Sequence, residues 1–167
     1  MSQNEGFAQV YQEHRQGLFT MALSVTRDQA SAEDAVHEAF VRLLRIEGED
    51  HTIKDFTAYA YGAVRRAAID QVRRRGKRVM VHESIFDDSA VTQPCAIDRA
   101  EEDALLRQAV ERLPDDERCC VVMRIYGELT FHQMSEALGD PVSTISSRYQ
   151  RALEQLRRIL SVKQEAM

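Results

Sequence analysis

Apolar side chains recur every three or four positions along most of the chain, the spacing that gathers them on one face of an α-helix. In the N-terminal half, this pattern predicts helices over Gly6–Thr26, from Ser31 to just before Gly48, and over Phe56–Arg75. Ser31 begins a sequence that resembles a capping box, which would start the second helix. A polar segment, 47–55, is predicted to be the loop before the third helix.

The pattern lapses over residues 79–100, which carry an Asp-Asp-Ser run and a proline and are predicted to link two domains. A helix containing Leu105 then follows. It should stop at Leu113, because a residue that precedes proline is disfavoured in helical geometry. The acidic triplet after Pro114 favours a new helix start, and Gly127 is expected to cap the end of that helix.

A helix-turn-helix is predicted in the last third of the chain. Thr130 and Gln133 match a capping box, so a short helix should begin there. The pair 139–140, Gly-Asp, supplies a tight turn, and Pro141 suits the first position of a second helix that continues to Leu160. Helix, short turn and helix form a unit typical of DNA-binding proteins.

The two sides of that second helix differ in chemistry. Its apolar side comprises Val142, Ile145, Tyr149, Ala152, Leu153, Leu156 and Leu160. Its outward side comprises Ser143, Ser147, Gln150, Arg151 and Arg158, with Thr144 and Arg148 nearer the flanks, where phosphates would lie. Small serines permit close approach to a major groove, and Gln and Arg can reach base edges. The alternative is an ordinary solvated helix of a small bundle.

Length and composition agree with a helical protein of two small units. The chain has 167 residues with only seven glycines and three prolines, few turn-forming residues for its length. The fold class predicted is all-α, with two small helical domains joined by an extended linker. The expected boundaries are 1–80 for the N-terminal domain, 81–100 for the linker and 101–167 for the helix-turn-helix domain.

A cytoplasmic location is expected. The longest uncharged stretch lies between Arg15 and Arg27 and is too short to span a bilayer, and no secretory signal is visible at the N-terminus. Cys95, Cys119 and Cys120 are odd in number, and two are adjacent, which suits neither a disulfide framework nor a paired zinc site. We therefore expect ordinary reduced thiols.

Charge is unevenly distributed, which changes the meaning of the net charge of −5. From Arg65 to His82, seven Lys or Arg stand against Asp70 alone, a local balance of +6. From Glu83 to Arg118, eleven acids face four bases, a balance of −7. A globally acidic chain can thus still neutralise phosphates at one basic helix. Asp70 is spaced to pair with Arg66 or Arg74 along that helix.

Enzymatic and metal-binding functions are not indicated. Asp34 with His37 resembles half of a di-metal motif, but no second such motif follows. Glu128 and His132 lie across a predicted helix start. The sequence contains no Gly-rich phosphate loop and no obvious catalytic triad. We expect no metal, no cofactor and no enzymatic activity.

Three segments in order resemble the extracytoplasmic-function (ECF) group of bacterial sigma factors of the sigma-70 family, the promoter-recognition subunits of RNA polymerase. The segment 31–40 is similar to the family's acidic helix that binds the polymerase clamp, and 59–75 to its basic helix at the −10 element. Segments 113–126 and 130–152 resemble its −35 reader. The likeness covers nearly the whole chain and implies a factor that directs core polymerase to promoters and initiates transcription.

The resemblance also implies site residues. The residues expected to bind polymerase are Glu33, Asp34, Glu38 and Phe40. At the −10 element, a flipped base is expected to enter a pocket at 47–54. The residues expected to contact this element are Tyr59, Arg65, Arg66, Arg73 and Arg74. Contact with the −35 element falls to Ser143, Thr144, Ser146, Ser147, Arg148, Gln150 and Arg151. Implied partners are the clamp and flap surfaces of core polymerase, promoter DNA and an anti-sigma factor, with no membrane insertion and a monomeric free chain.

Several positions depart from the family's pattern, namely His37, Tyr59, Arg66 and Ser143. Because the −10 loop and Gln150 are variable in the family, the promoter sequence does not follow from the resemblance. Two alternatives stay open: a stand-alone helix-turn-helix regulator, and a sigma mimic that binds a regulator without starting transcription. The first leaves the basic and acidic helices unexplained, and the second would be expected to have lost its DNA-contacting residues.

Overall fold

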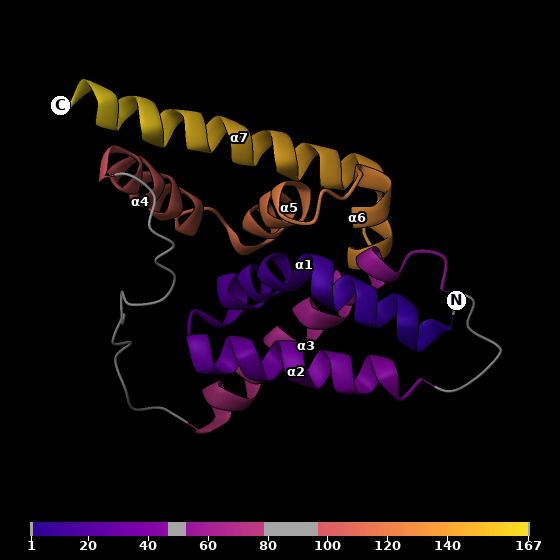
Figure 1. Ribbon diagram of the computed structural model, residues 1–167. Coiled ribbons are helices and arrows are strands. Elements are labelled where there is room, and N and C mark those ends of the chain that lie inside the picture. The colour runs from indigo at the N-terminus through magenta and orange to yellow at the C-terminus, as the bar shows by residue number, and fades with distance from the viewer. Residues whose placement is uncertain (1, 47–52, 79–96, 167) are drawn as a thin grey trace.

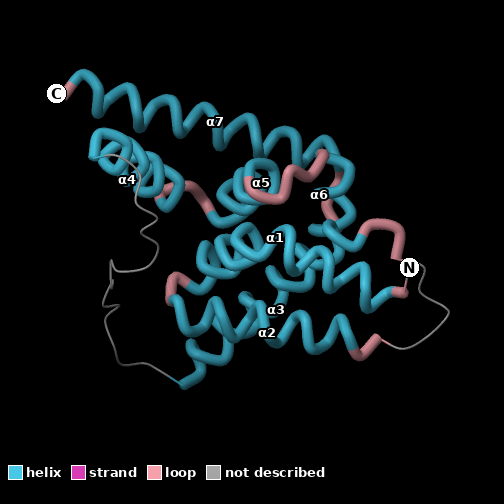
Figure 2. Tube along the Cα trace, viewed as in Figure 1, coloured by secondary structure: helices cyan, strands magenta, loops and turns pink. Residues whose placement is uncertain are grey.

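The computed structural model describes residues 2–46, 53–78 and 97–166, and within these ranges it is helical and contains no strand. Figures 1 and 2 show the helices in two groups, α1 to α3 below and α4 to α7 above. The all-α prediction is confirmed. The predicted pocket loop falls mostly outside these ranges, as do Cys95 and most of the predicted linker.

The first group contains α1 (Gln3–Thr26), α2 (Gln29–Leu44) and α3 (Phe56–Arg78), and each helix packs on the other two. A capping box between Ser2 and Glu5 begins α1. The second helix begins earlier than predicted, because the Asp28 carboxylate accepts a hydrogen bond from the Ser31 backbone N–H at 2.8 Å. The predicted cap at Ser31 was therefore wrong, and Ser31 lies inside the first turn.

The second group contains α4 (Ile97–Glu111), α5 (Asp115–Ile125), α6 (Phe131–Leu138) and α7 (Val142–Glu165). Figure 1 shows α7 running along the top of the molecule, with α4, α5 and the helix-turn-helix partner α6 beneath it. Apolar residues of α4, α5 and α7 form a small core. That core comprises Ala109, Leu113, Val121, Ala152 and Leu156.

Arg118 joins α4 to α5. Its side chain is buried and donates hydrogen bonds to the backbone oxygens of Glu111 and Leu113, both at 3.1 Å, and it pairs with Asp115. These carbonyls at the end of α4 would otherwise lack donors, so the arginine acts as a cap supplied by the next helix.

The helix-turn-helix was predicted with small errors at its ends. Thr130 and Gln133 form the predicted capping box, and Gly139 closes α6 in the left-handed region at φ 74°. Pro141, however, is the N-cap of α7 rather than its first residue. At the end of α5 it is Glu128, at φ 52°, and not Gly127, that adopts the left-handed conformation.

The ends of α4 also differ from prediction. This helix ends at Glu111, two residues before the predicted stop at Leu113, and a turn bridges to Pro114. It begins at Ile97, inside the segment 81–100 that was predicted as linker.

A single apolar core joins the two groups of helices. It contains residues of α1 to α3 together with residues of α5, α6 and α7. Fully buried members include Tyr61 of α3, Met21 of α1, Met123 of α5 and Met134 of α6. Each such side chain stabilises the fold by about 1.5–3 kcal/mol. The two groups are therefore packed together rather than merely tethered.

The backbones of the two groups approach closely at Gly62 of α3. A Cβ atom at this position would lie 2.6 Å from the carbonyl oxygen of Ala137 in α6, so only glycine lets the two backbones meet here. Beside it, the Tyr61 ring lies against Gly17 of α1 and Gly127 after α5. None of the helices in the described ranges is long and apolar enough to cross a membrane.

Candidate nucleic-acid interface

The outward side of α7 is accessible over its first three turns. Ser143, Ser147, Gln150 and Arg151 are exposed, whereas Ile145 is completely buried beneath them. Thr144 and Ser146 are half-buried at the flanks. The predicted outward side lies at the surface as expected. Val142, predicted to be on the apolar side, is exposed because it lies in the first turn beyond the edge of the core.

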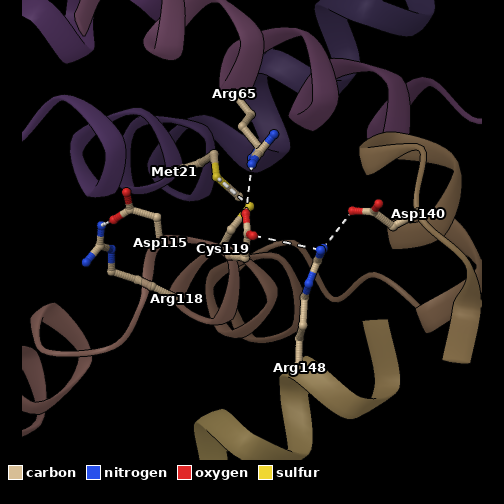
Figure 3. Close-up of polar contacts among 8 residues, drawn as sticks. Met21, Arg65, Asp115, Arg118, Cys119, Asp140 and Arg148 are labelled. Carbon is tan, nitrogen blue, oxygen red and sulfur yellow. Dashed lines mark hydrogen bonds and ion pairs between the residues drawn. The ribbon is translucent and has the colours of Figure 1, made fainter. Parts of the chain in front are cut away.

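Two arginines of α7 are paired with acids of the same group of helices. Arg151 donates to Glu117 through Nε at 3.2 Å, yet its side chain is still 59% exposed. Arg148 donates to Asp140 at 2.6 Å and lies 3.8 Å from Asp116, and its side chain is only 19% exposed. The hydrogen bond that Arg148 donates to the Asp140 carboxylate holds the pKa of Arg148 above its ordinary value. Figure 3 shows Arg148 pointing toward Asp140.

The basic helix α3 is covered at one end and open at the other. Arg65 points toward α5, where its guanidinium is 3.2 Å from Asp116, and its side chain is 25% exposed. Arg66 and Arg73 are exposed. Tyr59, in the first turn, is 38% exposed and lies beside the ring of Phe7 at a centroid distance of 6.1 Å.

The predicted pairing along α3 was wrong. Asp70 does not hold Arg66 or Arg74; the nearest cation to its carboxylate is Arg42 of α2, at 3.9 Å. Arg74 instead pairs with Glu38 of α2 at 2.9 Å. Spacing along one helix could not reveal these partners, because α2 packs beside α3 and presents its own charges.

The polymerase-docking candidates of α2 fall into two sets. Glu33 and Asp34 are exposed at the start of the helix. Glu38 is tied to α3 by Arg74 and by Gln71 at 3.2 Å, and these cations and donors outweigh its partial burial and hold its pKa below the usual value. Phe40 is buried, and its ring meets Tyr11 of α1 edge-on.

A groove of about 840 Å³ lies between α1 and α2. Phe40 and Glu33 line it, together with the partly exposed side chains of Tyr11 and Leu44. Apolar surface that stays open beside acidic side chains is suited to binding another protein.

The buried cysteines do not form a reactive site. Burial raises the pKa of Cys119 to about 12 and that of Cys120 to about 11, so both stay protonated near neutral pH. The Cys119 sulfur lies 3.6 Å from the sulfur of Met21 in α1 (Figure 3). Among the described residues, no three His, Cys, Asp or Glu side chains gather where they could hold a metal ion.

Sequence reasoning missed the role of the acidic turn that begins α5. Asp116 and Glu117 were assigned only to helix initiation, yet they face Arg65, Arg148 and Arg151. It also missed Gly62, since nothing in a sequence says which helix a glycine meets. The only available signal was the acidic triplet itself, in a chain whose candidate DNA contacts are basic.

Two family models match the chain. One describes Sigma-70 region 2 and covers residues 10–78, and the other describes Sigma-70 region 4 and covers residues 109–158. The first spans most of α1 to α3, and the second runs from the end of α4 into α7. The chain belongs to the sigma-70 family.

Individual relatives refine this membership. The chain is 28% identical over 162 residues to the ECF RNA polymerase sigma factor SigK of Mycobacterium tuberculosis, covering 93% of this chain and 86% of the relative. It is 26% identical over 146 residues to RNA polymerase sigma factor SigV of Bacillus subtilis, covering 87% and 85%. Together with the family models, these likenesses support the extracytoplasmic-function group that the motifs had indicated.

A solved structure has the same fold. The sigma factor RpoE of Bartonella quintana, crystallised with the anti-sigma factor NepR, matches with a TM-score of 0.72 at 20% identity, over 93% of this chain and 97% of the other. The likeness therefore extends over both groups of helices.

Proposed function

We propose that this chain directs core RNA polymerase to specific promoters and initiates transcription there, reading the −35 element through α7 and the −10 element through α3. The observation that carries the proposal is the exposed polar side of α7 within a helix-turn-helix of the sigma-70 family. Gln150 can pair with adenine and Arg151 with guanine in a major groove. Ser143, Thr144, Ser146 and Ser147 permit close approach, and Arg148 lies beside the phosphates.

The −10 contact is assigned to α3. Arg65, Arg66, Arg73 and Arg74 neutralise backbone phosphates, a contribution that is independent of sequence. Tyr59, partly exposed at the start of the helix, is placed to stack on an unpaired base. The pocket that would receive a flipped base is assigned to the segment 47–54, most of which lies outside the described residues.

Polymerase docking is assigned to the acidic start of α2 and the adjacent groove. Glu33 and Asp34 supply charge, Phe40 lines the apolar floor, and Glu38 orients α3 through Arg74. Together they would meet the clamp, while the helix-turn-helix domain would meet the flap. We expect an anti-sigma factor as a further partner, a monomeric free chain in the cytoplasm, and no catalytic activity of the chain's own.

Reconstituted transcription tests the proposal. The chain is mixed with bacterial core polymerase and a library of promoter sequences, and start sites are mapped. New starts that share sequence near −35 and −10 would support it. No binding to core polymerase would overturn it in favour of a stand-alone helix-turn-helix regulator. Binding without any initiation would instead indicate a sigma mimic.

The −35 assignment has a matched test within the same assay. Arg151→Ala should weaken selection at one −35 position, whereas Arg107→Ala, an equal change of charge at an exposed position of α4, should not. An unchanged −35 preference in the first variant would refute the assigned contact.

A further inference from the structure

The guanidinium of Arg148 lies where three segments of the helix-turn-helix domain meet. Its Nη1 donates to the carboxylate of Asp140, in the turn before α7, at 2.6 Å (Figure 3). Its Nη2 lies 3.8 Å from the carboxylate of Asp116, in the first turn of α5. Because Arg148 itself belongs to α7, one side chain links α5, the turn and α7.

These two carboxylates face the nitrogens that Arg148 would offer to DNA. An end-on bidentate contact with a phosphate uses both terminal nitrogens of a guanidinium. Each of those nitrogens of Arg148 faces an acid, and its side chain is only 19% exposed, against 59% for Arg151. A phosphate would therefore have to displace Asp140 from Arg148 rather than bind a free cation.

The start of α7 depends on this pair because its N-cap residue offers no cap. That residue is Pro141, whose ring carries no hydrogen-bond acceptor. The turn is held through Asp140 instead. The hydroxyl of Ser135 in α6 donates to the Asp140 backbone oxygen at 2.6 Å, and Arg148 binds the Asp140 side chain. The direction in which α7 leaves the turn thus depends on contacts made by Asp140.

The pair Asp140–Arg148 spans a part of α7 that is assigned to the −35 element. The serines and the threonine proposed to approach the major groove lie within residues 143–147, between the two partners in the sequence. This segment cannot tilt or fray without breaking the pair. A binding element that is ordered before it binds loses less conformational freedom on binding, and its side chains keep one alignment with the base edges.

We propose that Arg148 is a positioning residue, which pairs with Asp140 to hold the first turns of α7 in the orientation that reads the −35 element, and that it makes no phosphate contact of its own. This rests on the proposed function, which places Arg148 beside the phosphates. Asp116 is the weaker partner, since it is farther away and also faces Arg65 at 3.2 Å. Base discrimination then depends on an acidic residue, Asp140, that does not itself contact DNA.

Positioning and phosphate contact predict opposite effects for the loss of Asp140. If Arg148 bound a phosphate, Asp140→Ala would release its guanidinium and remove a negative charge near DNA, so every duplex would bind more tightly. If Arg148 positions α7, the same change reduces discrimination between bases. Alanine strains no backbone here, because Asp140 lies outside the left-handed region.

Fluorescence anisotropy of the holoenzyme, formed from core polymerase and each variant, measures binding to promoter duplexes that differ at single −35 positions. We expect Arg148→Gln and Asp140→Ala each to reduce the ratio of affinities for preferred over mismatched duplexes by about fivefold, as for the loss of one partly exposed hydrogen bond. The double variant should also lose about fivefold, because both changes remove the same pair. Reduced stability alone would lower the amount of active protein but not this ratio.

The salt dependence of binding separates the two roles again. Affinity falls with rising salt in proportion to the number of phosphates that the protein neutralises. Arg148→Gln should keep the slope of the wild type, whereas loss of a phosphate contact would lower its magnitude by about one. Arg107→Gln, the same change of charge at an exposed position of α4, is the matched control and should leave slope and discrimination unchanged. A lower slope in Arg148→Gln, tighter binding by Asp140→Ala, or unchanged discrimination in either would overturn the proposal.

Hydrogen exchange of the free chain, followed by NMR, tests the positioning without DNA. The Ile145 N–H makes the first backbone hydrogen bond of α7, to the Pro141 oxygen at 3.1 Å. It should exchange about fivefold faster in Arg148→Gln and Asp140→Ala than in the wild type and Arg107→Gln. Equal exchange rates would refute the positioning role even where the wild type shows a −35 preference. A wild-type holoenzyme without any −35 preference would refute the proposed function, and the exchange rates would still decide whether the pair holds α7.

Discussion

The two proposed DNA contacts differ in how much of each is free. On α7, the outward residues Ser143, Ser147 and Gln150 are all exposed, because the helix packs on its partners through the opposite side only. On α3, both sides of the N-terminal half are used: one packs on α1 and α2, and the other packs on α6 and reaches α5 through the ion pair of Arg65 with Asp116. Of the two proposed contacts, α7 therefore presents its outward side at the surface, whereas the N-terminal half of α3 is covered by other helices of the same chain.

The contrast follows from composition as much as from packing. The outward side of α7 is made of serines and of longer polar and charged residues such as Gln150 and Arg151, so it offers no apolar surface for another helix to bury. By comparison, α3 contains Ala58, Ala60, Ala63, Ala67 and Ala68 with Gly62, a sequence of small side chains that lets several helices approach closely. Because α3 can pack closely on several sides, neighbouring helices of the same chain bury more of its surface.

The largest effect on stability is expected at Tyr61, in the core between the two groups of helices. Tyr61→Ala removes a fully buried ring shared by the two groups of helices and should lower the free energy of unfolding by about 3–5 kcal/mol. Urea denaturation followed by circular dichroism measures this. Tyr61→Phe is the control, since the Tyr61 hydroxyl has no hydrogen-bond partner among the described residues and its loss should cost nothing. A tolerated alanine would mean that the two groups hardly depend on one another.

The next largest effect is expected on the outward side of α7, at Arg151. Arg151→Ala should reduce affinity for a −35 duplex by about 1–3 kcal/mol and relax the preference at one base pair, because a bidentate contact to guanine is lost. Fluorescence anisotropy on duplexes that differ at single positions gives both quantities. A uniform loss across all sequences would instead identify Arg151 as a phosphate contact.

Alkaline pH should lower the free energy of unfolding through Cys119, which is buried between α5 and α1. Burial raises the pKa of Cys119 to about 12, so the unfolded chain releases this proton at lower pH than the folded one. The stabilisation is complete below the ordinary thiol pKa and is lost between about pH 9 and pH 12, by about 1.4 kcal/mol per pH unit. Urea midpoints at pH 8 and pH 10 measure it. In Cys119→Ser the dependence should be shallower, and an unchanged slope would contradict burial of this thiol.

The smallest effect is expected at Glu117, which orients Arg151 but is not itself a proposed DNA contact. Glu117 is buried and accepts a hydrogen bond from Nε of Arg151, whose side chain remains 59% exposed. Glu117→Gln should keep the shape but loosen this orientation, reducing base discrimination at the Arg151 position by about 0.5–1 kcal/mol. The effect should vanish in the Arg151→Ala background. If it persists there, Glu117 acts on DNA binding by another route.

Local features were predictable because their causes lie within a few residues. The Thr130–Gln133 capping box, the left-handed Gly139 and the two sides of α7 all depend on backbone donors and helical period, which a sequence displays directly. Errors arose where two local solutions competed. Asp28 caps α2 in preference to Ser31, since either side chain can reach a free N–H and only the incoming chain direction decides between them.

The sequence by itself determined the helices, the outward chemistry of α7 and the family that the motifs indicate. Only the tertiary structure decided that Asp116 faces Arg65 and Arg148, that Glu38 rather than Asp70 holds Arg74, and that Gly62 meets Ala137. Helical period and capping act over one or two turns. Contacts between residues on different helices, such as Glu38 and Arg74, depend on which apolar faces pack together. Several arrangements satisfy the same sequence pattern until the core selects one.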